Sequence, residues 1–366
     1  MQIESPVVIE KEIGGRTLRL ETGKVAKLAG AAVLATYGGS TVLATVVRAD
    51  PRPGLDFFPM QVDYREKLSA GGKFPGGFRK REGAPNEKEV LTMRMIDRPI
   101  RPLFPDGFID EVQIQCWVMS HDGENDTDVI AGTAAAAALA ISDCPFEGPL
   151  ATVRVGRIFD EDDNITHVIN PTVSQLEFSD VDLVLSGHRD GMNMIEVGAA
   201  EIPEDELIEC IRFGETHIAT ILDMIEELTK KAGVEKRVGN LNLVPDEIMN
   251  RCREVCEEAL TEARQIPGKT ERSEKVAEIK RAFLEENYPL KPDATPGEFA
   301  DSETARKQAS EAFRTLEKKV TRKLIVEKGK RADGRFKSAW RLWPLGPRGC
   351  TPDSRPFGLA AVWRTR

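Results

Sequence analysis

Strands are the first elements that the hydrophobic pattern predicts. Residues 16–21 and 112–118 alternate between polar and apolar side chains, and residues 41–47 form a short apolar run rich in β-branched residues. Residues 37–40, with the sequence Tyr-Gly-Gly-Ser, supply a turn just before that run. Because successive side chains of a strand point to opposite faces of its sheet, we expect these three segments to be sheet strands.

Alanine-rich segments lie between these strands and after them. Residues 24–36 are rich in alanine and leucine, which predicts a compact segment packed on the sheet. Residues 122–128 are a polar loop, and an alanine-dominated run, 129–141, follows it. Small side chains let a helix approach a sheet closely, so we expect that run to be a buried helix.

The hydrophobic period changes from strand to helix near residue 200. Residues 182–186 and 193–197 flank a turn-forming stretch, which predicts a β-hairpin. Apolar residues then recur at helical spacing over residues 204–232, and Gly233 follows as a C-cap.

The chain beyond residue 245 is predicted to be helical. Residues 245–328 are highly charged and short of β-rich runs, and Pro267-Gly268 and residues 289–297 break them into separate helices. An α domain therefore follows a domain of mixed strands and helices, which gives an α+β fold class.

The composition excludes several classes of protein. The 366 residues carry a net charge of −9, with 40% hydrophobic and 30% charged residues, which argues against extended disorder. Six scattered cysteines form no CxxC pair, which favours a reducing compartment and predicts no metal site. Residues 1–13 lack the apolar core of a signal peptide, and no stretch is apolar enough to span a bilayer. We therefore expect a cytoplasmic protein without membrane contact.

A concentrated basic segment occupies residues 76–102. It contains four acids, Glu82, Glu87, Glu89 and Asp97, and seven bases, Arg79, Lys80, Arg81, Lys88, Arg94, Arg98 and Arg101. The last three bases are spaced for one face of a helix, which Pro99 and Pro102 then bring to an end. Fixed guanidinium groups suit phosphate oxygens. The alternative is that these arginines pair with the neighbouring acids in a solvated network.

An aromatic residue stands directly before the first three bases. Gly76 and Gly77 precede Phe78, so a loop there could approach a ligand closely. A ring beside cations can stack on a nucleobase. The alternative role of Phe78 is that of a core anchor, which is the more frequent role of phenylalanine.

Several long motifs of this chain match those of a known family. Residues 96–104 read IDRPIRPLF, and other motifs occur in order around them: ETGK at 21–24, DFFP at 56–59, REG at 81–83, NDTDVIA at 125–131 and RADGR at 331–335. Together they resemble the first half of the polyribonucleotide nucleotidyltransferase (polynucleotide phosphorylase) family. The resemblance implies a ribonuclease PH-like core, with the mixed sheet and helices of the ribosomal protein S5 domain 2-like fold, followed by an all-α domain.

The same resemblance implies domain boundaries. They are 1–145 for the first ribonuclease PH-like domain, 146–235 for its C-terminal α/β part, 236–327 for the all-α domain, 328–335 for the start of a second core, and 336–366 for a non-native or divergent tail.

The family's activity is phosphorolytic 3′ to 5′ degradation of single-stranded RNA in mRNA turnover. Inorganic phosphate is the co-substrate, nucleoside diphosphates are released, and the reaction reverses as polymerisation. The resemblance further implies Mg²⁺, a homotrimeric ring around an RNA channel, and association with RNA-degradation machinery. The alternative is a non-catalytic RNA-binding or ring-forming fragment.

The resemblance assigns RNA contacts but no catalytic residue. The family's channel loop maps onto Phe78, Arg79, Lys80 and Arg81, with Arg94, Arg98 and Arg101 as further basic contacts. One phenylalanine stands where many members have two, and Ala84 replaces a frequent arginine. The phosphate-binding serines and metal-binding acids of bacterial members belong to the second core. No residue of this chain is therefore assigned to catalysis or to Mg²⁺.

The last residues differ in character from the rest. Residues 336–366 hold Trp340, Trp343 and Trp363 with several prolines and almost no acid. Reading one base later through the codons for residues 351–356 can encode the family's Pro-Arg-Thr-His-Gly motif. We therefore expect a frameshift at or just after Arg335, with a genuinely divergent tail as the alternative.

Overall fold

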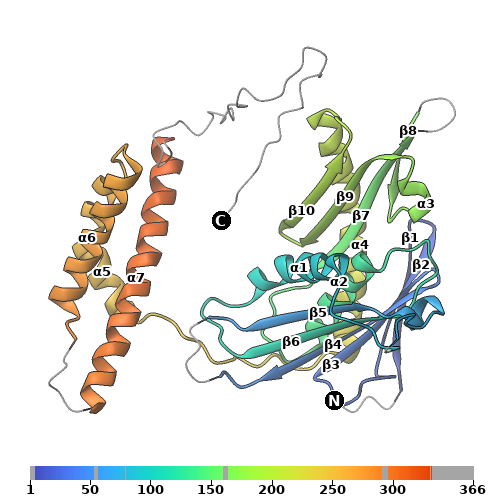
Figure 1. The fold of residues 1–366 in the computed structure, drawn as a ribbon, viewed down its shortest axis with the longest axis horizontal. Helices are drawn as coiled ribbons and strands as arrows, with labels where there is room; N and C mark the ends of the chain where they lie inside the picture. Colours follow the sequence, from blue (N-terminus) through green and yellow to red (C-terminus); the bar gives the residue numbers. More distant parts are fainter. Residues whose placement is uncertain are drawn as a thin grey trace. The chain divides into compact units, whose positions relative to one another are not determined.

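The computed structural model describes residues 5–52, 57–78, 80–159, 164–290, 296–329 and 331 (Figure 1). The chain divides into two compact units, Met1–Asn242 and a second unit that begins at Leu243. The finer domain boundaries expected from the sequence remain predictions. The tail from residue 336 onward lies outside the described residues.

A six-stranded sheet begins the first unit. Its strands are β1 (Val7–Ile13), β2 (Arg16–Thr22), β3 (Ala31–Tyr37), β4 (Ser40–Ala49), β5 (Met60–Glu66) and β6 (Glu111–Ser120). They lie in the order β1-β2-β3-β4-β6-β5. Strands β5 and β6 pair in parallel and the other neighbours pair antiparallel, so the sheet is mixed, as expected. The predicted strands correspond to β2, β4 and β6.

Strand β3 is a correction to the sequence prediction. Residues 24–36 were expected to form a compact segment packed on the sheet, but Ala31–Tyr37 is a strand between β2 and β4. Val33 and Ala35 are buried on one face, while Leu34 is half-buried on the other. Both faces of β3 carry apolar side chains, so the polar alternation that normally identifies a strand is absent.

Helix α2 (Thr127–Ile141) is entirely buried, as its alanine content predicted. It contacts β3, β4 and β7, and so lies between the first sheet and a second one. A side chain at Gly132 would bring its Cβ within 2.8 Å of the Thr152 Oγ1, so the close approach to β7 requires glycine.

The second sheet of the first unit is antiparallel. Its strands β7 (Ala151–Phe159), β8 (Ile165–Ile169), β9 (Ser179–His188) and β10 (Gly191–Ala199) lie in the order β10-β9-β7-β8. The predicted hairpin is confirmed as β9 and β10. The short helix α3 (Val173–Leu176) precedes β9.

Helix α4 (Glu204–Ala232) packs on β1, β7 and β9, and its bounds match the sequence prediction. Its C-cap is Gly233, which has an extended backbone conformation with φ −68°. The Gly233 N–H donates to Thr229 O. Helices α2 and α4 therefore join the two sheets into one hydrophobic core.

The second unit is helical, as predicted. It contains α5 (Asp246–Ala263), α6 (Lys269–Asn287) and α7 (Pro296–Lys328), and both expected breaks separate these helices. Its own core includes Cys252, Cys256, Phe283, Phe313 and Leu316. Among the described residues of the chain, no helix is long and apolar enough to cross a membrane.

Candidate nucleic-acid interface

The basic segment begins in an exposed loop, residues 72–86, between the 3-10 helix η1 (Leu68–Gly71) and helix α1 (Glu87–Ile100). Gly72 ends η1 in the left-handed conformation, with φ 69°. Phe78 is fully exposed, so it is not a core anchor. Lys80 and Arg81 are also exposed, whereas Arg79 lies outside the described residues. The loop therefore presents an aromatic ring and two cations to solvent.

A carboxylate fixes the two ends of this loop together. Glu82 accepts hydrogen bonds from the Lys67 Nζ at 2.6 Å and from the Leu68 N–H at 2.9 Å. These contacts hold the pKa of Glu82 below its usual value. The Lys67 Nζ also lies 5.1 Å from the centre of the Trp117 ring on β6. The loop thus projects from a closed base next to the sheet.

The start of α1 is fixed by a capping box that the sequence analysis missed. The Asn86 side chain accepts from the Glu89 N–H at 2.8 Å, and the Glu89 carboxylate accepts from the Asn86 N–H at 2.7 Å. Buried Glu89 also accepts from the Glu66 N–H at the end of β5. The spacing Asn-x-x-Glu directly before a helical run is the sequence pattern that would have predicted this capping box.

Two of the predicted arginines are exposed on α1. Arg94 makes no hydrogen bond or ion pair with another described residue, and the same holds for Arg81 in the loop. Arg98, one turn beyond Arg94, forms an ion pair with Glu196 of β10. Guanidinium groups without a protein partner are the ones available to a phosphate.

Arg101 follows α1, in the 3-10 helix η2 (Arg101–Leu103), and is held by the protein itself. Its guanidinium binds the Asp97 carboxylate and donates to Phe58 O and Met60 O, each at 3.0 Å. It also stacks 5.5 Å from the Phe58 ring. The alternative of pairing with neighbouring acids thus describes Arg101, whose donors already have acceptors.

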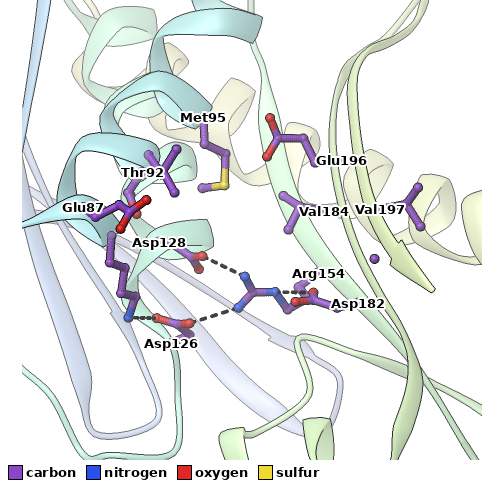
Figure 2. A pocket seen from close by; sticks show the side chains of 13 residues that line it. Glu87, Thr92, Met95, Asp126, Asp128, Arg154, Asp182, Val184, Glu196 and Val197 are labelled. Atoms are coloured by element: carbon purple, nitrogen blue, oxygen red, sulfur yellow. Dashed lines mark hydrogen bonds and ion pairs between the residues drawn. The ribbon is translucent and has the colours of Figure 1, made fainter. Parts of the chain in front are cut away.

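A pocket of about 600 Å³ opens beside α1 (Figure 2). It lies between α1, the start of α2, and strands β7, β9 and β10. Its lining has more acids than bases: Glu87, Asp126, Asp128, Asp182 and Glu196 against Lys88 and Arg154. Figure 2 shows Asp126, Asp128 and Asp182 gathered around the Arg154 guanidinium.

Arg154 forms ion pairs with three of these acids. Its nitrogens lie 3.1 Å from Asp126 Oδ2, 2.8 Å from Asp128 Oδ2 and 2.9 Å from Asp182 Oδ1. The Lys88 Nζ lies 3.1 Å from the other oxygen of Asp126. Both bases of the pocket are therefore neutralised by excess negative charge, which does not suit a phosphate group.

The pKa values of the pocket follow from burial and from this pairing. Burial raises the pKa of Asp128 above its usual value. Burial acts in the same direction on Asp126, but Lys88 and Arg154 outweigh it and lower the pKa of Asp126. Asp126 also caps α2 through the Thr127 N–H, so the network joins α1, α2 and β7. The network could not be predicted from local sequence, because Arg154 is distant in sequence from its partners.

The pocket does not provide a metal centre. Among the described residues, no group of three or more His, Cys, Asp or Glu side chains could hold a metal ion. The convergent carboxylates Asp126, Asp128 and Asp182 bind a guanidinium group instead of enclosing an open coordination point.

Family models match most of the chain. Residues 14–145 match domain 1 of the 3′ exoribonuclease family, and residues 148–216 match domain 2 of the same family. Residues 247–336 match the RNA-binding domain of polyribonucleotide nucleotidyltransferase.

Curated relatives agree with these matches. The polyribonucleotide nucleotidyltransferase of Heliobacterium modesticaldum is 44% identical over 90% of this chain and 44% of its own length. That of Bacillus subtilis is 44% identical over 96% of this chain and 48% of its own length. The chain thus spans about half the length of these relatives. A crystal structure of rice Rrp46 aligns with a TM-score of 0.44 at 13% identity, covering 61% of this chain and 94% of that one.

Proposed function

The chain belongs to the polyribonucleotide nucleotidyltransferase family, and from that premise we propose that it serves phosphorolytic 3′ to 5′ degradation of single-stranded RNA. In this reaction inorganic phosphate attacks the terminal phosphodiester and releases a nucleoside diphosphate. The described residues would contribute by binding the RNA strand.

The exposed loop is the observation that carries the proposal. Phe78 offers a free ring face, and Lys80 and Arg81 offer cations beside it. Single strands are bound by this combination, because every base has a face that stacks and every nucleotide has a phosphate. We propose direct RNA contacts for Phe78, Arg79, Lys80, Arg81 and Arg94.

Arg98 and Arg101 take a different part in the proposal. The sequence placed both in the RNA-binding group, but Glu196 holds Arg98 and Asp97 holds Arg101. We propose that Arg101 positions the end of α1, and that Arg98 can exchange Glu196 for phosphate at the exposed surface.

The phosphorolytic centre is proposed to lie elsewhere in the protein. The carboxylates that converge in the pocket, Asp126, Asp128 and Asp182, hold Arg154, so they do not fit Mg²⁺, and the net negative lining does not suit inorganic phosphate. We propose that the Mg²⁺ ligands belong to the family's second core, as the resemblance implies. The homotrimeric ring, the cytoplasmic location, association with RNA-degradation machinery and the five-part domain division belong to the same proposal and rest on family membership.

Binding and chemistry are tested on one substrate. Fluorescence anisotropy of a labelled oligoadenylate should show binding that weakens as salt is raised, and a matched RNA duplex should bind less tightly. A double substitution, Lys80→Glu with Arg81→Glu, should abolish most of the single-strand binding. Lys230→Glu with Lys231→Glu at the end of α4 is the matched charge control, because both lysines are exposed and lie outside the loop and outside the matched RNA-binding domain.

Phosphorolysis is measured separately, as nucleoside diphosphate released from the same oligoadenylate on addition of inorganic phosphate. Phosphate-dependent release supports the enzymatic part of the proposal. Release of nucleoside monophosphate without phosphate would indicate hydrolysis and contradict it. RNA binding with neither product would assign the chain a non-catalytic RNA-binding role.

A further inference from the structure

A second phenylalanine of the loop faces solvent without an assigned role. Phe74 is 80% exposed, in the same loop as Phe78. Its exposed ring forgoes the favourable free energy that burial would contribute. The loop therefore exposes two aromatic rings, Phe74 and Phe78, and exposed apolar side chains of this size are a mark of binding sites.

The loop holds this second ring next to a cation. The Lys80 N–H donates to Gly77 O at 3.0 Å, which closes a turn in which Lys80 takes the left-handed conformation with φ 50°. The turn brings the chain back toward Phe74, and the Lys80 Nζ lies 6.0 Å from the centre of the Phe74 ring. An ammonium at this distance is at the outer limit of a cation–π contact, so it remains free to bind an anion.

The position of Phe74 is fixed from the other side of the loop. The Lys73 N–H donates to Leu68 O at 2.9 Å, directly before Phe74. The Leu68 N–H is also a donor to Glu82, which closes the loop. Both ends of the loop are therefore tied to Leu68, which restricts the backbone on the two sides of Phe74.

The charge around Phe74 selects the kind of ligand. Lys73, Lys80 and Arg81 are exposed bases, and Glu82 is already paired with Lys67. A flat apolar ring with the Lys80 cation beside it, in a loop that carries further exposed bases, matches a nucleotide, which has an aromatic base and an anionic phosphate. An apolar protein partner would leave these cations without acceptors.

We propose that Phe74 and Lys80 form a second nucleotide-binding position in this loop, where the Phe74 ring stacks on a base of single-stranded RNA and Lys80 contacts a phosphate. This inference rests on the proposed RNA-binding function and extends it. It assigns two stacking rings to the loop, Phe74 and Phe78, separated along the chain and not adjacent.

Affinity for oligoadenylate, measured with the full chain, tests this proposal. Phe74→Ala and Phe74→Leu should each weaken binding about tenfold, because a base loses its stacking partner. Phe74→Tyr should bind like the wild-type chain. Phe178→Ala, which removes another exposed ring outside the loop, is the matched control and should leave affinity unchanged.

The salt dependence separates the ring from the cation. Phe74→Ala should leave the slope of log affinity against log salt unchanged, whereas Lys80→Gln should reduce it by about one. Thermal melting of each variant should match the wild type, because both side chains are exposed. A 2-aminopurine in the oligonucleotide should lose less fluorescence on binding to Phe74→Leu than to the wild-type chain.

The failures of the two proposals are distinguishable. Wild-type affinity in Phe74→Leu would show that no aromatic face is needed, and would overturn the inference while Phe78→Ala still weakens binding. A change of oligomeric state in Phe74→Ala with unchanged RNA affinity would instead indicate a protein contact, and would also overturn it. Absence of binding by the wild-type chain would overturn the proposed function and this inference with it.

Discussion

At the scale of single residues, Arg94 and Arg101 belong to one basic segment but have different surroundings. Arg94 is exposed, without a described protein partner, whereas Arg101 binds Asp97 and the carbonyls of Phe58 and Met60. A free guanidinium can bind RNA, and an engaged one stabilises the fold.

We therefore expect one alanine substitution to affect RNA binding and the other to affect stability. Arg94→Ala should weaken RNA binding about threefold to tenfold and leave the free energy of unfolding unchanged. Arg101→Ala should lower the free energy of unfolding by about 1–3 kcal/mol, because it removes charge-assisted hydrogen bonds. Urea denaturation and anisotropy titration of both variants measure these effects. Loss of stability in Arg94→Ala, with no change in affinity, would contradict the assignment.

Asp122 is a residue whose contribution depends on pH. Its carboxylate accepts from the N–H groups of Gly39, Glu124 and Asn125. Burial alone would raise its pKa, but these hydrogen bonds outweigh it and hold the pKa well below the usual value. Because the pKa of Asp122 is lower in the folded than in the unfolded chain, its carboxylate stabilises the fold at any pH above the unfolded pKa of about 3.9. This contribution is lost as the pH falls toward and through the folded pKa.

Asp122→Asn should accordingly destabilise the chain by about 1 kcal/mol at pH 7, because the amide loses one acceptor oxygen. The difference in free energy of unfolding between the variant and the wild type should decrease as the pH falls below about 3.9, because the ionised wild-type carboxylate then stabilises the fold less. Chemical denaturation at pH 7 and pH 3.5 compares the two. An unchanged difference at both values would refute the ionised role of Asp122.

At the scale of elements, the sequence predicted the helices and strands whose hydrophobic pattern has one clear period. Strand β6 and helix α4 followed from period two and period 3.6 respectively. Strand β3 was missed, since apolar residues on both of its faces hide the alternation. The capping box of α1 could have been read from Asn86 and Glu89.

The site was less predictable than the elements, for a physical reason. The sequence could identify the basic segment and its exposed ring, because both are local in the chain. It could not show that Arg101 reaches the carbonyls of Phe58 and Met60 at the start of β5, or that Arg154 of β7 gathers carboxylates from α2 and β9. Those contacts depend on how distant elements pack.

Helix α2 gives a prediction about packing. Gly132 faces Thr152, whose hydroxyl forms a hydrogen bond of 2.8 Å with the Ser186 hydroxyl. Moving the Thr152 side chain away would therefore break this hydrogen bond. Gly132→Val should lower the free energy of unfolding by about 1–3 kcal/mol through overpacking. Ala277→Val on the exposed face of α6 adds the same branched side chain and should cost less than about 1 kcal/mol. Equal losses in the two variants would argue against the close helix–sheet contact.

At the scale of the whole molecule, the described residues form two separate hydrophobic cores, one for the two sheets and one for α5, α6 and α7. Each core holds only residues of its own unit. Separate cores allow each unit to fold independently.

We expect residues 5–242, expressed alone, to unfold in one cooperative transition. Circular dichroism with thermal melting measures this, and the full chain should show a matching transition. A fragment that lacks cooperative unfolding would show that the first unit depends on the second.

The central claim is that the exposed loop before α1 binds single-stranded RNA. Photo-cross-linking of a 4-thiouridine-containing oligonucleotide to the full chain, followed by mass-spectrometric mapping, tests it most directly. The account predicts cross-links concentrated in residues 73–82, at Phe74, Phe78 and their neighbours, and reduced by unlabelled oligoadenylate. Cross-links spread over the surface, or concentrated in the acidic pocket around Arg154, would contradict it.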